Sequence, residues 1–227
     1  MIRDAFMFIY ILKILECNWS IHDEFLLQYV SDERKQKIRK YQFEIDKKLA
    51  LYGALLIRAG IIRKLNCRND ELIFQNTEHG KPYLANNLNL YFNMSHTRNA
   101  VVCGVSETSI GIDIERIADP CLEILQSCFH KEEKKILETH SEECKYNFYK
   151  IWTQKEAYTK CDGIGICQDL SKINVLSNEI QKNLSTCFYG DYVYSIYSEK
   201  VCSDLMKLEL SMDWLYEFFG SDQKHAI

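Results

Sequence analysis

Two carboxylates placed two residues apart are the sequence feature that most suggests chemistry. Asp113 and Glu115 lie in the run GIDIE at 111–115, where isoleucine alternates with charge as it does on a strand. Residues two apart on a strand share a face, so both carboxylates should project together while the isoleucines face a core. Such an oxygen pair suits Mg²⁺, which takes one or two carboxylates and completes its shell with water and substrate phosphate. An ordinary amphipathic strand with a solvated face is the alternative.

A second candidate group lies in the run WTQKEAYTK at 152–160. At 3.6 residues per turn, Trp152, Glu156 and Lys160 form one ridge of a helix. On the functional interpretation, Glu156 is a third metal ligand or a general base, and Lys160 neutralises a departing phosphate. On the structural interpretation, Glu156 and Lys160 are a surface ion pair worth a few tenths of a kcal/mol.

A polar pair and a set of basic residues complete the candidates. Ser95 and His96 follow a predicted strand, where loops commonly carry binding groups, although isolated histidines there are usually structural. Arg34 and Lys37 are three apart on a predicted helix and can clamp a phosphate together, and Lys81 lies in a Gly-Lys-Pro turn. A solvated charged face is the default interpretation of each cation. There is no G-x-S-x-G, Walker loop or G-x-G-x-x-G, so hydrolytic triads and the usual nucleotide folds are disfavoured.

The elements that would position these residues predict an α+β fold. Apolar spacing predicts a long helix over 45–65 with one buried face, and Ser31 is expected to cap a short basic helix that ends near Lys40. Helix and strand occur without regular βαβ alternation, which argues against a doubly wound sheet. Helices are expected at about 121–129, 131–139, 141–161 and 212–219, and strands at 5–12, 88–94, 100–105, 110–117, 172–176, 187–189 and 192–197.

Composition excludes several classes of protein. The 227 residues are 47% hydrophobic and carry a net charge of −4, which disfavours a dedicated nucleic-acid binder. No run approaches the roughly 18–20 apolar residues of a membrane span, and the N-terminal run lacks the cleavage site of a signal peptide. The ten cysteines form no C-x-x-C pair and have mostly apolar flanks, as buried thiols have. We therefore expect a cytoplasmic protein.

Taken in order, these motifs resemble the 4′-phosphopantetheinyl transferases, in particular the larger type that activates peptide and polyketide synthases of secondary metabolism. The resemblance covers about residues 25–170, and its two last motifs are specific when found together about 40 residues apart. The motifs are Ser31-x-x-Arg34-x-x-Lys37, Gly80-Lys81-Pro82, Asn93-x-Ser95-His96-Thr97, Gly111-Ile112-Asp113-Ile114-Glu115 and Trp152-x-x-Lys155-Glu156-Ala157-x-x-Lys160.

The resemblance implies a monomer of two similar α+β subdomains, 1–107 and 108–227, related by pseudo-two-fold symmetry with the active site between them. It implies coenzyme A as donor, Mg²⁺ (or Mn²⁺) as metal, the serine of an apo acyl or peptidyl carrier protein as acceptor, and adenosine 3′,5′-bisphosphate as by-product.

Carried over residue by residue, the resemblance assigns the metal to Asp113, Glu115 and Glu156, and catalysis to Glu156 and Lys160. The same resemblance implies that coenzyme A is held by Arg34, Lys37, Lys81, Ser95 and His96. Glu133 matches a further acidic position of the family.

One position departs from the family pattern. An arginine usually stands three residues after the aspartate of the long helix, whereas here Asp46 is followed at that place by Leu49. Weaker coenzyme A binding is the resulting hypothesis, with Lys48 as a possible substitute that points about 100° away on the helix. Two other functions stay open: a catalytically inactive relative that binds coenzyme A or a carrier protein, and an unrelated magnesium-dependent phosphate-transfer enzyme.

Overall fold

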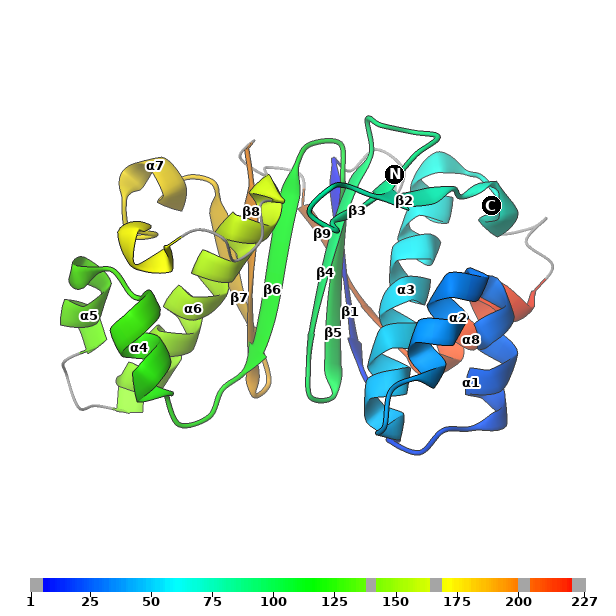
Figure 1. Cartoon of the computed structure of the whole chain (residues 1–227), viewed down its shortest axis with the longest axis horizontal. Helices are drawn as coiled ribbons and strands as arrows, with labels where there is room; N and C mark the ends of the chain where they lie inside the picture. The colour runs from blue at the N-terminus through cyan, green and yellow to red at the C-terminus, as the bar shows by residue number, and fades with distance from the viewer. Residues whose placement is uncertain (1–5, 138–141, 164–168, 200–204, 222–227) are drawn as a thin grey trace.

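The computed structural model describes residues 6–137, 142–163, 169–199 and 205–221, and within them the chain forms four layers (Figure 1). Two β-sheets lie in the middle of the molecule, and helices cover the outer face of each sheet. The α+β class is therefore confirmed. Among the described residues, no helix combines the length and the apolar character needed to cross a membrane.

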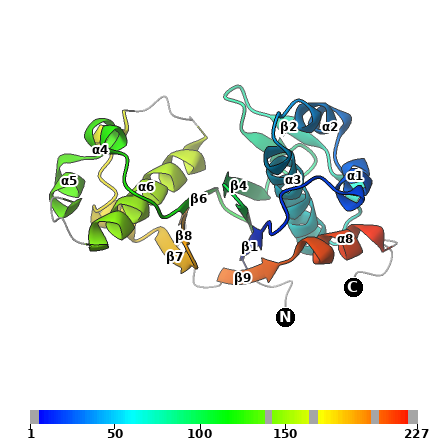
Figure 2. The ribbon, with the colours of Figure 1, turned by 90° about the horizontal axis from the view of Figure 1, so that it is seen from below.

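The first sheet has the strand order β4-β5-β1-β9. Its inner strand β1 pairs antiparallel with β5 and parallel with β9, so that strands from opposite parts of the sequence lie side by side (Figure 2). The bounds of the strands are Met7–Lys13 (β1), Tyr91–Thr97 (β4), Ala100–Ser106 (β5) and Leu205–Leu210 (β9).

The outer face of this sheet is covered chiefly by α3 (Glu44–Leu65). We expected one buried face on this helix, but every residue from Lys48 to Ile62 is buried. The reason is that shorter elements enclose the helix on the side away from the sheet. These elements are α1 (Ile21–Leu26), the short turn Leu27–Tyr29, α2 (Asp32–Arg39), the turn Asn69–Glu71, the hairpin β2 (Phe74–Asn76) and β3 (Pro82–Leu84), and α8 (Met212–Gly220).

The second sheet has the order β6-β8-β7 and packs its outer face against α6 (Glu142–Asp162). Its inner face meets the first sheet through an apolar layer that includes Ile112, Ile114 and Ile9. The strands are β6 (Ile110–Arg116), β7 (Leu184–Tyr189) and β8 (Tyr192–Ser198), and the other helices are α4 (Leu122–Cys128), α5 (Lys131–Leu137), a short turn Leu170–Lys172 and α7 (Asn178–Gln181).

The strand expected at 172–176 is wrong. The backbone there has no strand partner because buried side chains use its polar groups: the carbonyl of Ile173 accepts from Lys155, and the amide of Val175 donates to Glu133. Backbone N–H and C=O groups can bond to a neighbouring strand or to buried side chains, and alternating apolar residues occur in both cases. The spacing alone therefore cannot distinguish a strand from this segment.

The last described elements return to the first half of the molecule. Strand β9 completes the sheet of β1, and α8 packs against α3 and α1. Residues 205–220 thus lie with the first sheet, although the expected division at 107/108 groups them with the second half.

Candidate active site

The close approach of α6 to β6 is made possible by Gly111. A Cβ atom at this position would lie 1.9 Å from the carbonyl oxygen of Ala157 and 2.4 Å from the amide nitrogen of Cys161. Only glycine therefore lets the helix backbone rest on the strand. Asp113 and Glu115 alternate with Ile112 and Ile114, so they share the face of Gly111, which meets α6. The expected shared face of the two carboxylates is thus covered by a helix rather than solvated.

Asp113 is the centre of a three-residue contact. Its Oδ1 atom accepts from Ser95 Oγ at 2.7 Å and from Lys160 Nζ at 2.5 Å, and Lys160 Nζ lies 3.2 Å from Ser95 Oγ. The Asp113 side chain is 5% exposed, whereas Lys160 is 31% exposed. The second carboxylate oxygen, Asp113 Oδ2, is buried and has no hydrogen-bond partner among the residues that the structure describes. A buried acceptor without a partner is rare in native proteins and calls for an explanation.

Strand β4 contacts β6 through alternate side chains. Asn93 Oδ1 accepts from the backbone amide of Ile112 at 3.1 Å, Ser95 donates to Asp113, and Thr97 Oγ1 donates to Glu115 Oε2 at 2.9 Å. The two edge strands are therefore joined by side chains instead of a backbone ladder. Asn93 and Thr97 lie in the quoted Asn-x-Ser-His-Thr motif, but nothing in the sequence assigned them these partners.

Burial raises the pKa values of all three candidate metal ligands. For Asp113, desolvation outweighs the opposing effect of Lys160. For Glu115 and Glu156, desolvation acts in the same direction as the negative charge of Asp113. The three carboxylates thus repel one another in a site of low polarity, and a bound cation would relieve that repulsion.

The chemistry of these donors, three carboxylates, is of the kind that a hard divalent cation such as Mg²⁺ prefers. All three candidate side chains offer oxygen, and the unpaired Asp113 Oδ2 is a ready acceptor. In the arrangement described here, Lys160 occupies Asp113 Oδ1. Across residues 6–137, 142–163, 169–199 and 205–221, no three histidine, cysteine, aspartate or glutamate side chains are grouped around one point.

Arg34 and Lys37 lie in a separate place, on the wall of a cavity of about 500 Å³. Gly80 and Pro82 line the same cavity, as do the apolar side chains of Phe74, Phe92 and Met94. Two cations beside apolar and aromatic surface suit a ligand with a phosphate and a flat ring.

Sequence reasoning missed Arg58, which also lines this cavity. Its guanidinium lies 4.8 Å from the centroid of Phe74 and donates to Asn69 Oδ1 at 2.9 Å. Burial, and then the positive charge of Arg34, lower the pKa of Arg58 to about 10. The signal was an arginine inside the otherwise apolar run 54–62 of the long helix, where a buried cation needs a reason.

Lys81 and His96 complete the predicted set. Lys81 does not point at the cavity: its ammonium donates to the carbonyl oxygens of Lys160 and Cys161, at 2.8 Å each. His96 is exposed near the end of β4, and partial burial of its ring together with the charge of Lys160 lowers its pKa. The structure thus brings Ser95, Asp113 and Lys160 into contact and keeps Arg34 and Lys37 in the neighbouring cavity.

Lys48 cannot replace an arginine at position 49. Its side chain is fully buried, and its Nζ lies 3.2 Å from Asp23 Oδ2. The other oxygen of the Asp23 carboxylate accepts a hydrogen bond from the Tyr52 hydroxyl. Leu49 is 2% exposed within the apolar core. The suggestion that Lys48 contacts phosphate is therefore wrong, because its charge is already paired inside the protein.

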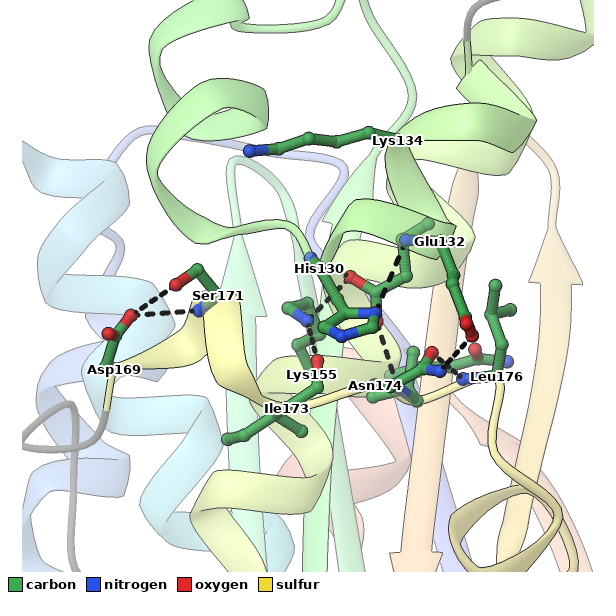
Figure 3. A network of polar contacts seen from close by, with 12 residues as sticks. His130, Glu132, Lys134, Lys155, Asp169, Ser171, Ile173, Asn174 and Leu176 are labelled. Carbon is green, nitrogen blue, oxygen red and sulfur yellow. Dashed lines mark hydrogen bonds and ion pairs between the residues drawn. The ribbon is translucent and has the colours of Figure 1, made fainter.

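Glu133 has a structural partner, Lys155, which is labelled in Figure 3 together with His130 and Ile173. Its Oε2 atom accepts from Lys155 Nζ at 2.7 Å and from the amide of His130, and its Oε1 atom accepts from the amide of Val175. Lys155 also donates to the carbonyl of Ile173. Both charged side chains are fully buried, so this network fastens α5 and the segment 173–175 to α6.

Comparison with known proteins identifies the family of this chain. Residues 109–206 match the family model described as the 4′-phosphopantetheinyl transferase superfamily, and residues 18–108 match the model of the 4′-phosphopantetheinyl transferase N-terminal region. Together these two matches run from residue 18 to residue 206 and include β4, β5, the three strands of the second sheet and the candidate site, whereas β1 lies outside them.

Individual relatives carry the same name. The chain is 30% identical over 190 residues to the 4′-phosphopantetheinyl transferase Sfp of Bacillus subtilis, and the aligned region covers 80% of this chain and 85% of that protein. It is 34% identical over 158 residues to the 4′-phosphopantetheinyl transferase gsp of Aneurinibacillus migulanus, and this alignment covers 69% of the chain and 66% of the relative. It is 27% identical over 216 residues to the L-aminoadipate-semialdehyde dehydrogenase-phosphopantetheinyl transferase of Mus musculus, covering 88% and 66%. The chain therefore belongs to the 4′-phosphopantetheinyl transferase superfamily, as an enzyme of the Sfp-like type.

Proposed function

We propose that this enzyme transfers the 4′-phosphopantetheine arm of coenzyme A to a serine of an apo acyl or peptidyl carrier protein. The reaction depends on Mg²⁺, or Mn²⁺ in its place, and releases adenosine 3′,5′-bisphosphate. The proposal rests on one arrangement. Asp113 is buried with one carboxylate oxygen unpaired among the described residues, and Lys160 contacts its other oxygen. Lys81 bonds the end of the helix that carries Lys160 to the turn whose Gly80 and Pro82 line the cationic cavity of Arg34 and Lys37. A small donor with several phosphates needs both places at once.

The adenosine end of coenzyme A is assigned to the cavity. Arg34 and Lys37 neutralise its phosphate, and Gly80 and Pro82 border the base, while the Lys81 side chain between them bonds to the end of α6. Ser95 and His96, on the neighbouring strand, stand next to the pyrophosphate. A basic cavity for one polyanion is compatible with the acidic balance of the whole chain.

The carboxylates and Lys160 are assigned to the reacting end. Asp113, Glu115 and Glu156 would hold the metal ion, which supplies positive charge to the pyrophosphate oxygens when bound. Glu156 accepts the proton of the carrier serine, directly or through a water molecule, because burial raises its pKa and makes it a better base. The serine oxygen–phosphorus bond forms as the bond between that phosphorus and the bridging oxygen breaks. Lys160 stabilises the charge that the leaving phosphate acquires.

Several finer expectations belong to the same proposal. The two halves, 1–107 and 108–227, are proposed to be related by pseudo-two-fold symmetry, with the active site between them and residues 205–220 crossing back. The enzyme is proposed to act as a monomer in the cytoplasm. The eight cysteines that the structure describes are all free thiols, which suits a reducing compartment.

The experiment is intact-protein mass spectrometry of an apo carrier protein incubated with this enzyme, coenzyme A and Mg²⁺, beside an EDTA control. A gain of one phosphopantetheine unit that EDTA abolishes supports both the reaction and its metal dependence. If several unrelated carriers gain nothing while calorimetry detects coenzyme A binding, the inactive binding relative is the better description. If coenzyme A does not bind, the assignment of the cavity is overturned.

A further inference from the structure

Lys81 connects the two halves of the molecule at the end of the helix that carries Lys160. Its ammonium donates to the carbonyl oxygens of Lys160 and Cys161, at 2.8 Å each, across about 80 residues of sequence. Helix α6 ends at Asp162, and its last four carbonyl groups have no partner within the helix. Lys81 therefore satisfies two of these groups, one of which belongs to Lys160 itself.

The charge of Lys81 suits this position. The C-terminal end of an α-helix carries a partial negative charge, and a cation there is stabilising. The following residue, Gly163, has a φ of 71°, and a Cβ atom on it would lie 2.9 Å from Lys81 Cδ. The chain thus passes closely beneath the Lys81 side chain, and glycine is required both for the backbone angle and for the space.

The backbone around Lys81 is fixed at its other side. The amide of Thr77 donates to the carbonyl of Lys81, the amide of Lys81 donates to Thr77 Oγ1, and Gly80 donates to the carbonyl of Thr77. The neighbours of Lys81, Gly80 and Pro82, line the cationic cavity, whereas Lys81 is not part of that lining. One closed turn therefore contacts the cavity with its backbone and the end of α6 with its side chain.

We propose that Lys81 is a positioning residue that transmits occupancy of the cavity to Lys160. A ligand seated against Gly80 and Pro82 holds the turn, the turn holds Lys81, and Lys81 holds the carbonyl end of α6 from which Lys160 reaches Asp113. Lys81 acts in this way through the helix and not through contact with a phosphate of the donor. The kinetic part of this inference rests on the proposed transferase function.

The kinetic test compares Lys81→Met with Lys81→Arg, and uses Lys135→Met, an exposed lysine of α5, as matched control. We expect Lys81→Met to lower kcat roughly 10- to 100-fold, the range for a catalytic group displaced by about 1 Å, with KM for coenzyme A changed less than threefold. Lys81→Arg should recover most of kcat, and Lys135→Met should match the parent. A loss confined to KM, and absent when 3′-dephospho-coenzyme A is the donor, would instead mean that Lys81 binds the 3′-phosphate.

A second measurement needs no turnover and so separates this inference from the proposed function. Hydrogen exchange of the backbone amides at 157–162 is followed in the free enzymes and with adenosine 3′,5′-bisphosphate as the probe. We expect about tenfold faster exchange in Lys81→Met than in the parent or in Lys135→Met, because the last turn loses both hydrogen bonds from Lys81 and keeps the one that Ser109 donates to the carbonyl of Cys161. The probe should slow exchange there in the parent and leave Lys81→Met unchanged. Equal exchange in all three free proteins would overturn the inference.

Discussion

Two of the lysines of helix α6, Lys155 and Lys160, each pair with a buried carboxylate from another element, yet the two pairs differ in completeness. Around Lys155 and Glu133, both carboxylate oxygens accept hydrogen bonds, the ammonium has two acceptors, and neither side chain is exposed. Around Lys160 and Asp113, one carboxylate oxygen is buried without a partner in the described part of the chain, and the lysine remains 31% exposed.

On the proposed function, this difference separates a structural ion pair, Lys155 with Glu133, from a catalytic one, Lys160 with Asp113. A buried pair stabilises a fold only when further hydrogen bonds complete it, as they do for Glu133. An incomplete pair beside two more carboxylates is costly to the free protein, and the proposed metal cation and polyanionic donor would relieve that cost. Two similar lysine–carboxylate contacts can therefore be assigned to different roles by counting the partners of each oxygen.

The largest expected effect is on turnover at the incomplete pair. Glu156→Gln and Asp113→Ala should each lower turnover by at least 100-fold, because each removes a metal ligand or the base while leaving the fold in place. The measurement is carrier-protein mass gain over time, with circular dichroism as the check on folding. Full activity in a variant whose spectrum matches the parent would remove that residue from the mechanism.

The complete pair should respond in stability. Lys155→Met leaves the Glu133 carboxylate buried without its cation, and we expect the free energy of unfolding to fall by about 3–5 kcal/mol. The double variant Lys155→Met, Glu133→Gln should be less impaired, since a neutral amide oxygen still accepts from the amide of Val175. Urea unfolding of the three proteins measures this. A change below 1 kcal/mol in the single variant would contradict the contrast between the two pairs.

A smaller effect is expected from Thr97, which donates to Glu115. Thr97→Val preserves the shape of the side chain but removes the donor, so Mn²⁺ affinity should fall about 10-fold, at the low end of the range for groups that orient metal ligands. Thr97→Ser restores the donor and should restore the affinity. Electron paramagnetic resonance of free Mn²⁺ provides the measurement. Equal affinities in Val and Ser variants would show that this hydrogen bond does not orient Glu115.

The smallest effect concerns pH and the free enzyme. Burial raises the pKa of Glu115, so its ionisation destabilises the folded state as pH rises from the ordinary glutamate pKa, about 4.3, through the raised value. Glu115→Gln should therefore increase the melting temperature of metal-free enzyme at pH 7 and leave it unchanged near pH 4. A change of about 1 kcal/mol moves the melting temperature of a chain this long by roughly 2–4 °C. A melting temperature of Glu115→Gln below that of the parent at pH 7 would contradict this prediction.

Much of this arrangement was predictable from the sequence because it is local. The ridge of Glu156 and Lys160, the shared face of Asp113 and Glu115, and the Ser31 cap on Arg34 each follow from a helical or strand period. The left-handed backbone at Gly163 also follows from its place after a helix.

What could not be predicted depends on contacts between distant segments. Thr97 and Glu115, Lys81 and Lys160, and Lys155 and Ile173 meet only after folding, and no period in the sequence links them. The same reason explains the mistaken strand at 172–176 and the mistaken role for Lys48. Each rested on a local pattern whose polar groups are satisfied by a partner far away in the chain.

The parallel pairing of β1 with β9 has a consequence for synthesis on the ribosome. Strand β5, which pairs with β1 on its other side, ends at Ser106, whereas β9 begins at Leu205. At roughly 5–20 residues per second, the nascent chain spends on the order of 5–20 s with one edge of β1 unpaired. During that interval the second sheet and α6 can form first. We therefore expect the nascent chain to expose the unpaired backbone N–H and C=O groups of one β1 edge, which chaperones would recognise.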